Sequence, residues 1–128
     1  MSIRVLIVED QADIRRLLRE TLALDDYLFS EASDAPSGWE LVQHWRPDIV
    51  LADIMMPGAF DGLELCRRIK ADAQLKQTRV LLVSARGHRH DLDIGRQVGA
   101  DDYLIKPFSP QRLLERLAAL SELQSPAA

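Results

Sequence analysis

The chain has 128 residues, of which 47% are hydrophobic and 28% are charged, and its formal net charge is −4. This length and composition are typical of one globular domain with its own buried core. The negative charge argues against direct binding of nucleic acid. The first apolar run, Ile3 to Val8, is too short for a signal or membrane segment. The single cysteine, Cys66, cannot form an internal disulfide, which favours a cytoplasmic protein.

Five short apolar runs alternate with five amphipathic segments along the chain. The predicted strands are Ile3 to Val8, Tyr27 to Ala32, Ile49 to Ala52, Val80 to Val83 and Tyr103 to Ile105. The predicted helices are a first one around Ile14 to Leu22, a second from the cap Ser33 or Asp34 to Pro47, a third from Leu63 to Asp72, a fourth from His88 to Val98, and a last one that begins at Pro110 after the cap Ser109. Strict alternation predicts an α/β fold with an open parallel sheet that is covered on both faces.

The spacing of apolar residues also predicts which side of each helix is buried. In the first helix Leu17 and Leu18 are expected to face the sheet, whereas Arg15 and Arg19 are expected to face solvent. The same reasoning places four leucines of the last helix against the core, Leu113, Leu114, Leu117 and Leu120.

Polar side chains stand where four of the predicted strands end. Glu9 and Asp10 follow the first strand, Asp53 the third, Ser84 the fourth and Lys106 the fifth. Because ligands of open α/β sheets bind outside the carboxyl ends of the strands, we expect these five groups to converge. Three carboxylates and one ammonium leave a net charge of about −2. Mg²⁺ would relieve this repulsion, since it takes few carboxylates and accepts phosphate oxygens as ligands. No His or Cys stands at these strand ends, which argues against zinc.

Longer motifs surround these residues. They are Glu9-Asp10, Asp53 with Met56-Pro57 and Asp61-Gly62, Ser84-Ala85, and the segment from Gly99 to Phe108. Together they resemble the receiver domain of two-component response regulators, a CheY-like family, over roughly Ile3 to Leu120. The resemblance implies a doubly wound, five-stranded parallel sheet in the flavodoxin-like order 2-1-3-4-5. It favours a receiver domain over residues 1–123, followed by a flexible tail or the start of a linker over residues 124–128.

The resemblance implies a role for each residue at the sheet edge. Asp53 would accept a phosphoryl group from the phosphohistidine of a sensor histidine kinase or phosphotransfer protein. Glu9, Asp10, Asp53 and the backbone carbonyl of Met55 would bind Mg²⁺, and Lys106 would neutralise phosphoryl oxygens. The domain would catalyse only its own phosphorylation and dephosphorylation, so it would not be an enzyme in the usual sense.

Phosphorylation would also change the shape of one face. Ser84 would move toward the phosphoryl group and Tyr103 would turn inward behind it, which would repack the face made by the fourth helix, fifth strand and fifth helix. That face would contact an output domain or a second copy of the chain. Winged-helix transcription regulators of this family dimerise through charged pairs on this face. Leu92, Ile94 and Arg112 stand where those regulators usually have charged residues of other sign or type, so a different, partly apolar face is an alternative.

Three further features concern the surroundings of the phosphoryl site. Met55 and Arg86 would flank the phosphoryl group and give it a moderately long lifetime. The Lys106–Pro107 peptide bond would be cis, as in relatives. The loop from Gly58 to Asp61 is one residue longer than is usual in the family, and we expect a bulge that exposes Phe60.

Three other functions are weighed against a receiver. A flavodoxin-like flavin or nucleotide binder needs a Gly, Ser or Thr-rich loop after the first strand, and Glu9-Asp10-Gln11 does not supply one. A phosphatase with an Asp-x-Asp pair needs a second acid two residues after Asp10 or Asp53, where Ala12 and Met55 stand. A pseudo-receiver that only binds proteins would not need the full set of site residues. A single-domain regulator, a phosphorelay shuttle and one part of a longer regulator all remain open.

Overall fold

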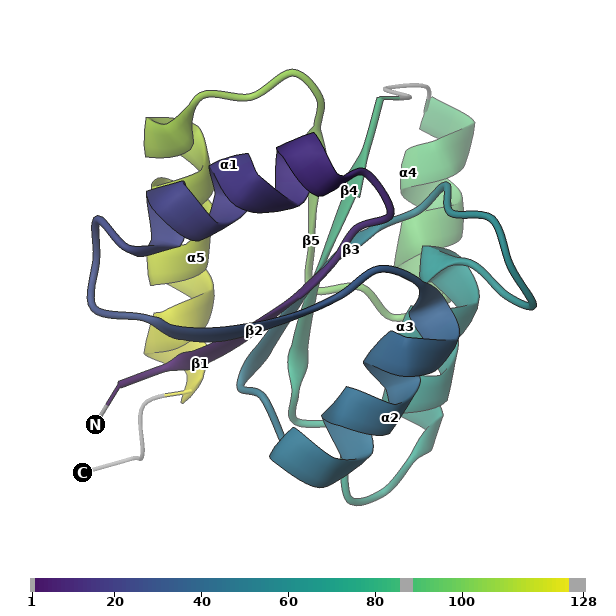
Figure 1. Cartoon of the computed structure of the whole chain (residues 1–128). Helices are drawn as coiled ribbons and strands as arrows, with labels where there is room; N and C mark the ends of the chain where they lie inside the picture. Colours follow the sequence, from purple (N-terminus) through teal and green to yellow (C-terminus); the bar gives the residue numbers. More distant parts are fainter. Residues whose placement is uncertain (1, 86–88, 125–128) are drawn as a thin grey trace.

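The computed structural model describes residues 2–85 and 89–124. The strands are β1 (Arg4–Val8), β2 (Leu28–Ala32), β3 (Ile49–Asp53), β4 (Arg79–Ser84) and β5 (Asp102–Ile105). The helices are α1 (Ala12–Leu22), α2 (Ala35–Trp45), α3 (Gly62–Ala71), α4 (Arg89–Gln97) and α5 (Pro110–Gln124). All strand pairs are parallel, and the sheet has the order β2-β1-β3-β4-β5 (Figure 1). The predicted fold class and strand order are therefore confirmed.

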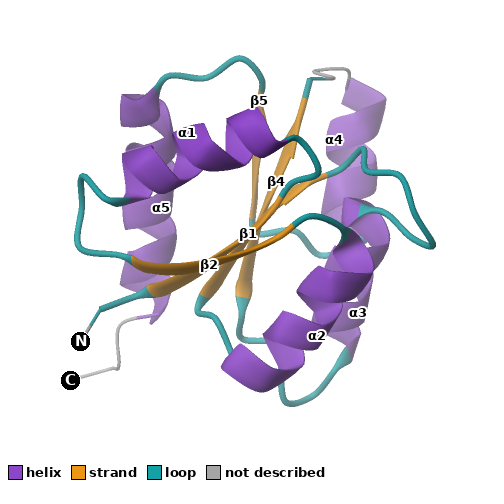
Figure 2. Cartoon of the chain, viewed as in Figure 1, coloured by secondary structure: helices purple, strands orange, loops and turns teal. Residues whose placement is uncertain are grey.

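Helices cover both faces of the sheet. α1 and α5 lie on one face, and α2, α3 and α4 lie on the other (Figures 1 and 2). Successive residues of a strand point to opposite faces, so each strand contributes to two apolar layers. In β1, Leu6 and Val8 pack in the layer beneath α2 and α3, and Val5 and Ile7 pack in the layer beneath α1 and α5. None of the described helices is long and apolar enough to cross a membrane.

Element ends differ from the prediction by a few residues. Asp53 is the last residue of β3 and not the first residue after it. α3 begins one residue early, at Gly62. α5 continues to Gln124, which was expected to begin the tail, and residues 125–128 lie outside the described part of the chain. None of these shifts moves the strand ends away from the common edge of the sheet.

Two residues of α1 do not face the way that the pattern predicted. Leu17 was expected to be buried, but 53% of its surface is exposed. The buried stripe of α1 is narrower than expected and consists of Leu18, Thr21 and Leu22. Arg15 was expected to face solvent, but its side chain reaches the loop at the end of β1. Both predictions were wrong because periodicity alone does not tell how much of a helix its neighbours cover.

The N-terminus of α2 is capped by Asp34. Its carboxylate accepts a hydrogen bond from the backbone N–H of Ser37 at 2.8 Å, whereas Ser33, the other predicted cap, is exposed. We expect Asp34→Ala to lower the free energy of unfolding by about 1 kcal/mol, because one helix N–H loses its acceptor. Urea denaturation measures this change. Ser33→Ala is the control and should have no effect, and equal effects of the two substitutions would contradict Asp34 as the cap.

Candidate functional site

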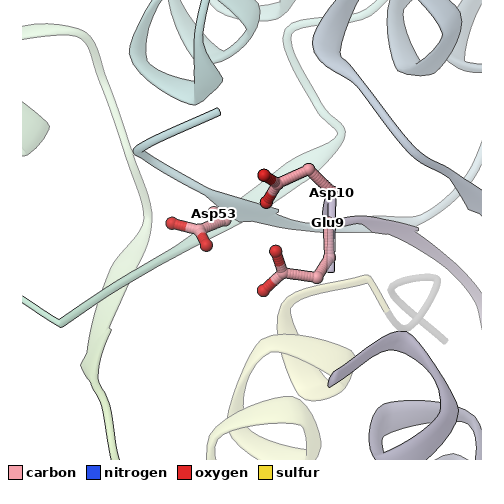
Figure 3. A group of neighbouring side chains, drawn as sticks. All are labelled: Glu9, Asp10 and Asp53. Carbon is pink, nitrogen blue, oxygen red and sulfur yellow. The ribbon is translucent and has the colours of Figure 1, made fainter. Parts of the chain in front are cut away.

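The ends of two adjacent strands bring three acids together. Glu9 and Asp10 follow β1 directly, and Asp53 ends β3, which pairs with β1. One carboxylate oxygen from each residue lies within 4.8 Å of the others. Figure 3 shows the three carboxyl groups beside one another. Glu9 and Asp53 are buried and Asp10 is partly exposed, so the cluster opens to solvent on one side.

Lys106 joins the acids from the end of β5. Its Nζ donates hydrogen bonds to Oε1 of Glu9 at 2.7 Å and to Oδ2 of Asp53 at 2.8 Å. Oδ1 of Asp53 accepts a hydrogen bond from the backbone N–H of Met55 at 3.0 Å. Each oxygen of the Asp53 carboxylate therefore has a donor. The Lys106–Pro107 peptide bond is cis.

The other predicted site residues lie around this centre. Ser84 is buried at the end of β4, and its backbone carbonyl accepts a hydrogen bond from the N–H of Lys106 at 2.8 Å. Tyr103 of β5 is partly buried and packs against the apolar layer beneath α2 and α3. Met55 is 53% exposed. Arg86, which was predicted to influence the lifetime of a phosphoryl group, lies outside the described residues.

The pKa values of Glu9 and Lys106 reflect their burial and the charges around them. Burial raises the pKa of Glu9 to about 7, the hydrogen bond from Lys106 lowers it only in part, and the neighbouring Asp10 and Asp53 raise it further. Burial also opposes the charge of Lys106, but hydrogen bonds to Asp53 and Glu9 outweigh this effect and raise the pKa of the lysine. The lysine is therefore an ammonium at neutral pH, and the site still carries more negative than positive charge.

The raised pKa of Glu9 predicts how stability depends on pH in buffer that contains EDTA. The pKa is higher in the folded protein than the ordinary value of 4.5, so the folded protein binds more protons between about pH 4.5 and pH 7. The free energy of unfolding should therefore fall as the pH rises through this window, by about 1–3 kcal/mol. Urea denaturation at pH 5 and pH 8 measures the fall. Glu9→Gln should remove most of it, and the same fall in this variant would contradict the assignment to Glu9.

One residue at this edge was not predicted from the sequence. Arg15 of α1 donates hydrogen bonds from Nη1 to the backbone carbonyls of Glu9 at 2.8 Å and Asp10 at 3.1 Å. The alternation of polar and apolar residues only marked it as a charged residue on a helix surface. Its position in the first turn of α1 could have indicated this contact, because long side chains of a helix point back toward the helix N-terminus. That direction brings Arg15 to the loop between β1 and α1.

The long loop between β3 and α3 does not expose Phe60, which corrects the expectation from the sequence. Phe60 is partly buried and packs against the apolar layer beneath α2 and α3. The guanidinium of Arg68 lies 3.9 Å from the centroid of its ring, and Glu64 accepts a hydrogen bond from Arg68 at 2.9 Å. Covering apolar surface with an aromatic ring is more favourable than exposing the ring to water. Within the stretch from Gly58 to Asp61, the exposed residues are instead Gly58 and Ala59.

The family model described as response regulator receiver domain matches residues 5–118. The chain belongs to this family. Receiver domains are signalling domains of two-component systems and not conventional enzymes, and the match removes the flavin-binding and phosphatase alternatives. The match covers all the strand ends that carry Glu9, Asp10, Asp53, Ser84 and Lys106.

Similar proteins come from several organisms. Response regulator MprA of Mycobacterium sp. (strain KMS) is 37% identical over 126 residues, which are 98% of this receiver domain and 54% of the relative. The phosphate regulon transcriptional regulatory protein PhoB of Pseudomonas aeruginosa is 36% identical over 122 residues, which are 95% of this chain and 53% of the relative. The structure of chemotaxis protein CheY4 of Vibrio cholerae matches with a TM-score of 0.88 at 29% identity and covers 94% of this chain and 99% of its own. The receiver domain thus spans about half the length of the curated relatives named here.

Proposed function

We propose that this receiver domain accepts a phosphoryl group on Asp53 from the phosphohistidine of a sensor histidine kinase or phosphotransfer protein, with Mg²⁺ as its cofactor. The position of the Asp53 carboxylate carries the proposal. Asp53 is the last residue of β3, and one of its carboxylate oxygens lies within 4.8 Å of oxygens of Glu9 and Asp10. Its Oδ2 lies 2.8 Å from Nζ of Lys106. A carboxylate is a competent nucleophile for phosphoryl transfer, and it stands here among charges that suit a phosphoryl group and a divalent cation.

The donor set of the cluster fits Mg²⁺. Glu9, Asp10 and Asp53 offer only oxygen atoms, which are the ligands that Mg²⁺ prefers. Lys106 forms ion pairs with Glu9 and Asp53, and one ammonium does not balance the charge of three carboxylates, so a further cation would be favoured. We propose these three carboxylates and the backbone carbonyl of Met55 as the protein ligands. Bound Mg²⁺ would act as a Lewis acid that neutralises charge on phosphoryl oxygens.

The proposed transfer forms one bond and breaks one. An oxygen of Asp53 bonds to phosphorus while the phosphorus–nitrogen bond of the phosphohistidine breaks, and the electron pair of that bond stays on the imidazole nitrogen. The other ring nitrogen carries a proton, so the imidazole leaves as a neutral group. Lys106 already contacts Asp53, and its ammonium would stabilise the negative charge on the phosphoryl oxygens during the transfer. The Ser84 hydroxyl would donate a hydrogen bond to one of these oxygens.

We also propose that the phosphoryl group biases the face of α4, β5 and α5 through Ser84 and Tyr103. The Tyr103 ring lies beside Gly95 of α4, where a methyl group would sit only 3.4 Å from Cδ2 of the ring. Movement of this ring therefore changes the contact between β5 and α4. The face would bind an output domain or a second copy of the chain.

Three residues of this face were predicted to make it partly apolar. Of these, Ile94 is partly buried and Arg112 is exposed, and the side chain of Leu92 lies outside the described residues.

The remaining parts of the proposal concern the setting of the domain. PhoB is described as a transcriptional regulatory protein, so a DNA-binding output domain in a longer regulator is one proposal for the output. The receiver domain itself would not contact DNA. A cytoplasmic location and a domain boundary near the end of α5, followed by a tail or linker, stay predictions.

Intact mass spectrometry after incubation with acetyl phosphate tests the function. We expect a gain of one phosphoryl group that requires Mg²⁺, is absent with EDTA and is lost at alkaline pH. Because some receivers accept phosphoryl groups only from their kinase, fluorine NMR with beryllofluoride and Mg²⁺ is the second arm, and it should show a bound fluoride signal. Absence of both the mass gain and this signal would contradict the proposal and favour a pseudo-receiver.

A further inference from the structure

Arg15 holds the backbone beneath the acid cluster. Its Nη1 donates to the carbonyl oxygens of Glu9 at 2.8 Å and Asp10 at 3.1 Å. These carbonyls belong to the two consecutive acids that the proposed function assigns to Mg²⁺. Only 19% of the Arg15 side chain is exposed, so water competes little for the two hydrogen bonds.

Arg15 is itself anchored on the edge strand. Its Nε donates to Oε1 of Glu31 on β2 at 3.2 Å. Glu31 also accepts hydrogen bonds from Nη1 of Arg19 at 2.8 and 2.7 Å. The hydrogen bond from Arg19 is the largest of the effects that lower the pKa of Glu31, and Arg15 adds to it. Two arginines one helical turn apart therefore share one charged carboxylate, but only Arg15 also reaches the loop.

The loop needs such a support because its acids repel one another. Two consecutive carboxylates have to point toward Asp53 although like charges disfavour that arrangement. The backbone N–H of Glu9 is bonded to the carbonyl of Ala32 at 3.1 Å, so β2 holds one side of the Glu9 peptide. The guanidinium of Arg15 holds the carbonyl side of the same residue and continues to Asp10. Ligands of a metal site are generally oriented by such outer contacts.

We propose that Arg15 is a positioning residue that fixes the backbone of Glu9 and Asp10 and so aims their carboxylates at Asp53. Glu31 supports this role by orienting the guanidinium. The consequence for Mg²⁺ rests on the proposed function, whereas the consequence for the loop does not. Arg15 would thus influence the site without contacting the metal or the phosphoryl group.

Isothermal titration of MgCl₂ into the whole chain tests the effect on the metal site. We expect Arg15→Met to weaken Mg²⁺ binding by about tenfold or more, as is usual when an outer contact of a metal site is lost. Arg19→Met is the matched control, because it also removes a partner of Glu31 but touches neither carbonyl. It should change the affinity by less than about twofold. Equal affinities in all three proteins, or equal weakening in both variants, would overturn the inference and leave the proposed function intact.

Hydrogen exchange without metal tests the loop separately. In a peptide that covers Glu9 to Gln11, backbone amides should exchange faster in Arg15→Met than in the unmodified chain or in Arg19→Met. The melting temperatures of the two variants are recorded with it, so that general destabilisation is recognised. If the unmodified chain bound no Mg²⁺, the proposed function would fail and this exchange experiment would still decide the role of Arg15. Unchanged exchange in Arg15→Met would overturn that role.

Discussion

Asp53→Asn is expected to abolish phosphorylation by acetyl phosphate. The amide has nearly the same size as the carboxylate but is not a competent nucleophile, so no phosphoryl group should be detected on the intact protein. The substitution also disturbs the local hydrogen bonds. Both oxygens of Asp53 accept a hydrogen bond, one from Lys106 and one from the N–H of Met55, and an asparagine has an oxygen for only one of them.

Asp61→Asn is the matched control for this experiment. It makes the same chemical change at the far end of the β3–α3 loop, at a residue whose carboxylate caps α3 by accepting a hydrogen bond from the N–H of Glu64 at 3.0 Å. Asparagine caps helices as well as aspartate does, so the fold and the phosphorylation should both persist. Phosphorylation of Asp53→Asn to the normal extent, or loss of phosphorylation in both variants, would contradict Asp53 as the acceptor.

Gly62→Ala should be among the most damaging small substitutions in the chain. A methyl group on Gly62 would lie 2.1 Å from the carbonyl oxygen of Asp53 and 3.1 Å from Cα of Ile54. Both contacts are with backbone, which cannot turn aside as a side chain can. We expect the free energy of unfolding to fall by more than about 2 kcal/mol, at the upper end of overpacking effects. Because the displaced backbone carries the acceptor, phosphorylation by acetyl phosphate should also slow.

Gly95→Ala separates this clash from the general effect of replacing a glycine. Its methyl group would make ordinary contacts, 3.4 Å from the Tyr103 ring and 3.6 Å from Leu82. In a helix interior, alanine is favoured over glycine by up to about 1 kcal/mol, so this variant should be as stable as the unmodified chain or more so. Thermal and urea denaturation of both variants measure the difference. A Gly62→Ala protein as stable as Gly95→Ala would show that the β3–α3 loop can shift freely.

The sequence predicted the centre of the site because the relevant residues end strands. Asp53 interrupts a continuous apolar run, and Glu9 and Lys106 stand at the ends of two others. In a parallel sheet, strand ends share one edge, so the fold class alone brings these residues close together. Some helix caps were also predictable, because a cap depends only on residues close by in the sequence. Ser109, for example, accepts a hydrogen bond from the N–H of Arg112 at 3.1 Å.

Contacts between distant segments could not be predicted in this way. Arg15 looked like a solvent-facing residue because its partners, Glu31 and the Glu9 carbonyl, are defined only once β1, β2 and α1 are packed together. Phe60 was expected to be exposed because the sequence shows the length of the loop but does not show that the ring packs against Arg68. The raised pKa of Glu9 likewise depends on burial, which the pattern along the chain does not measure.

Chemical mapping of the phosphoryl group tests the central proposal most directly. The domain is phosphorylated with acetyl phosphate and Mg²⁺, the acyl phosphate is reduced with borohydride, and peptides are sequenced by mass spectrometry. Borohydride reduction converts a phosphorylated aspartate into homoserine, and we expect this residue at position 53 and at no other aspartate. Homoserine at Asp10 or Asp61, or a stable phosphoryl group on a serine or histidine, would contradict the assignment of Asp53 as the phosphoacceptor.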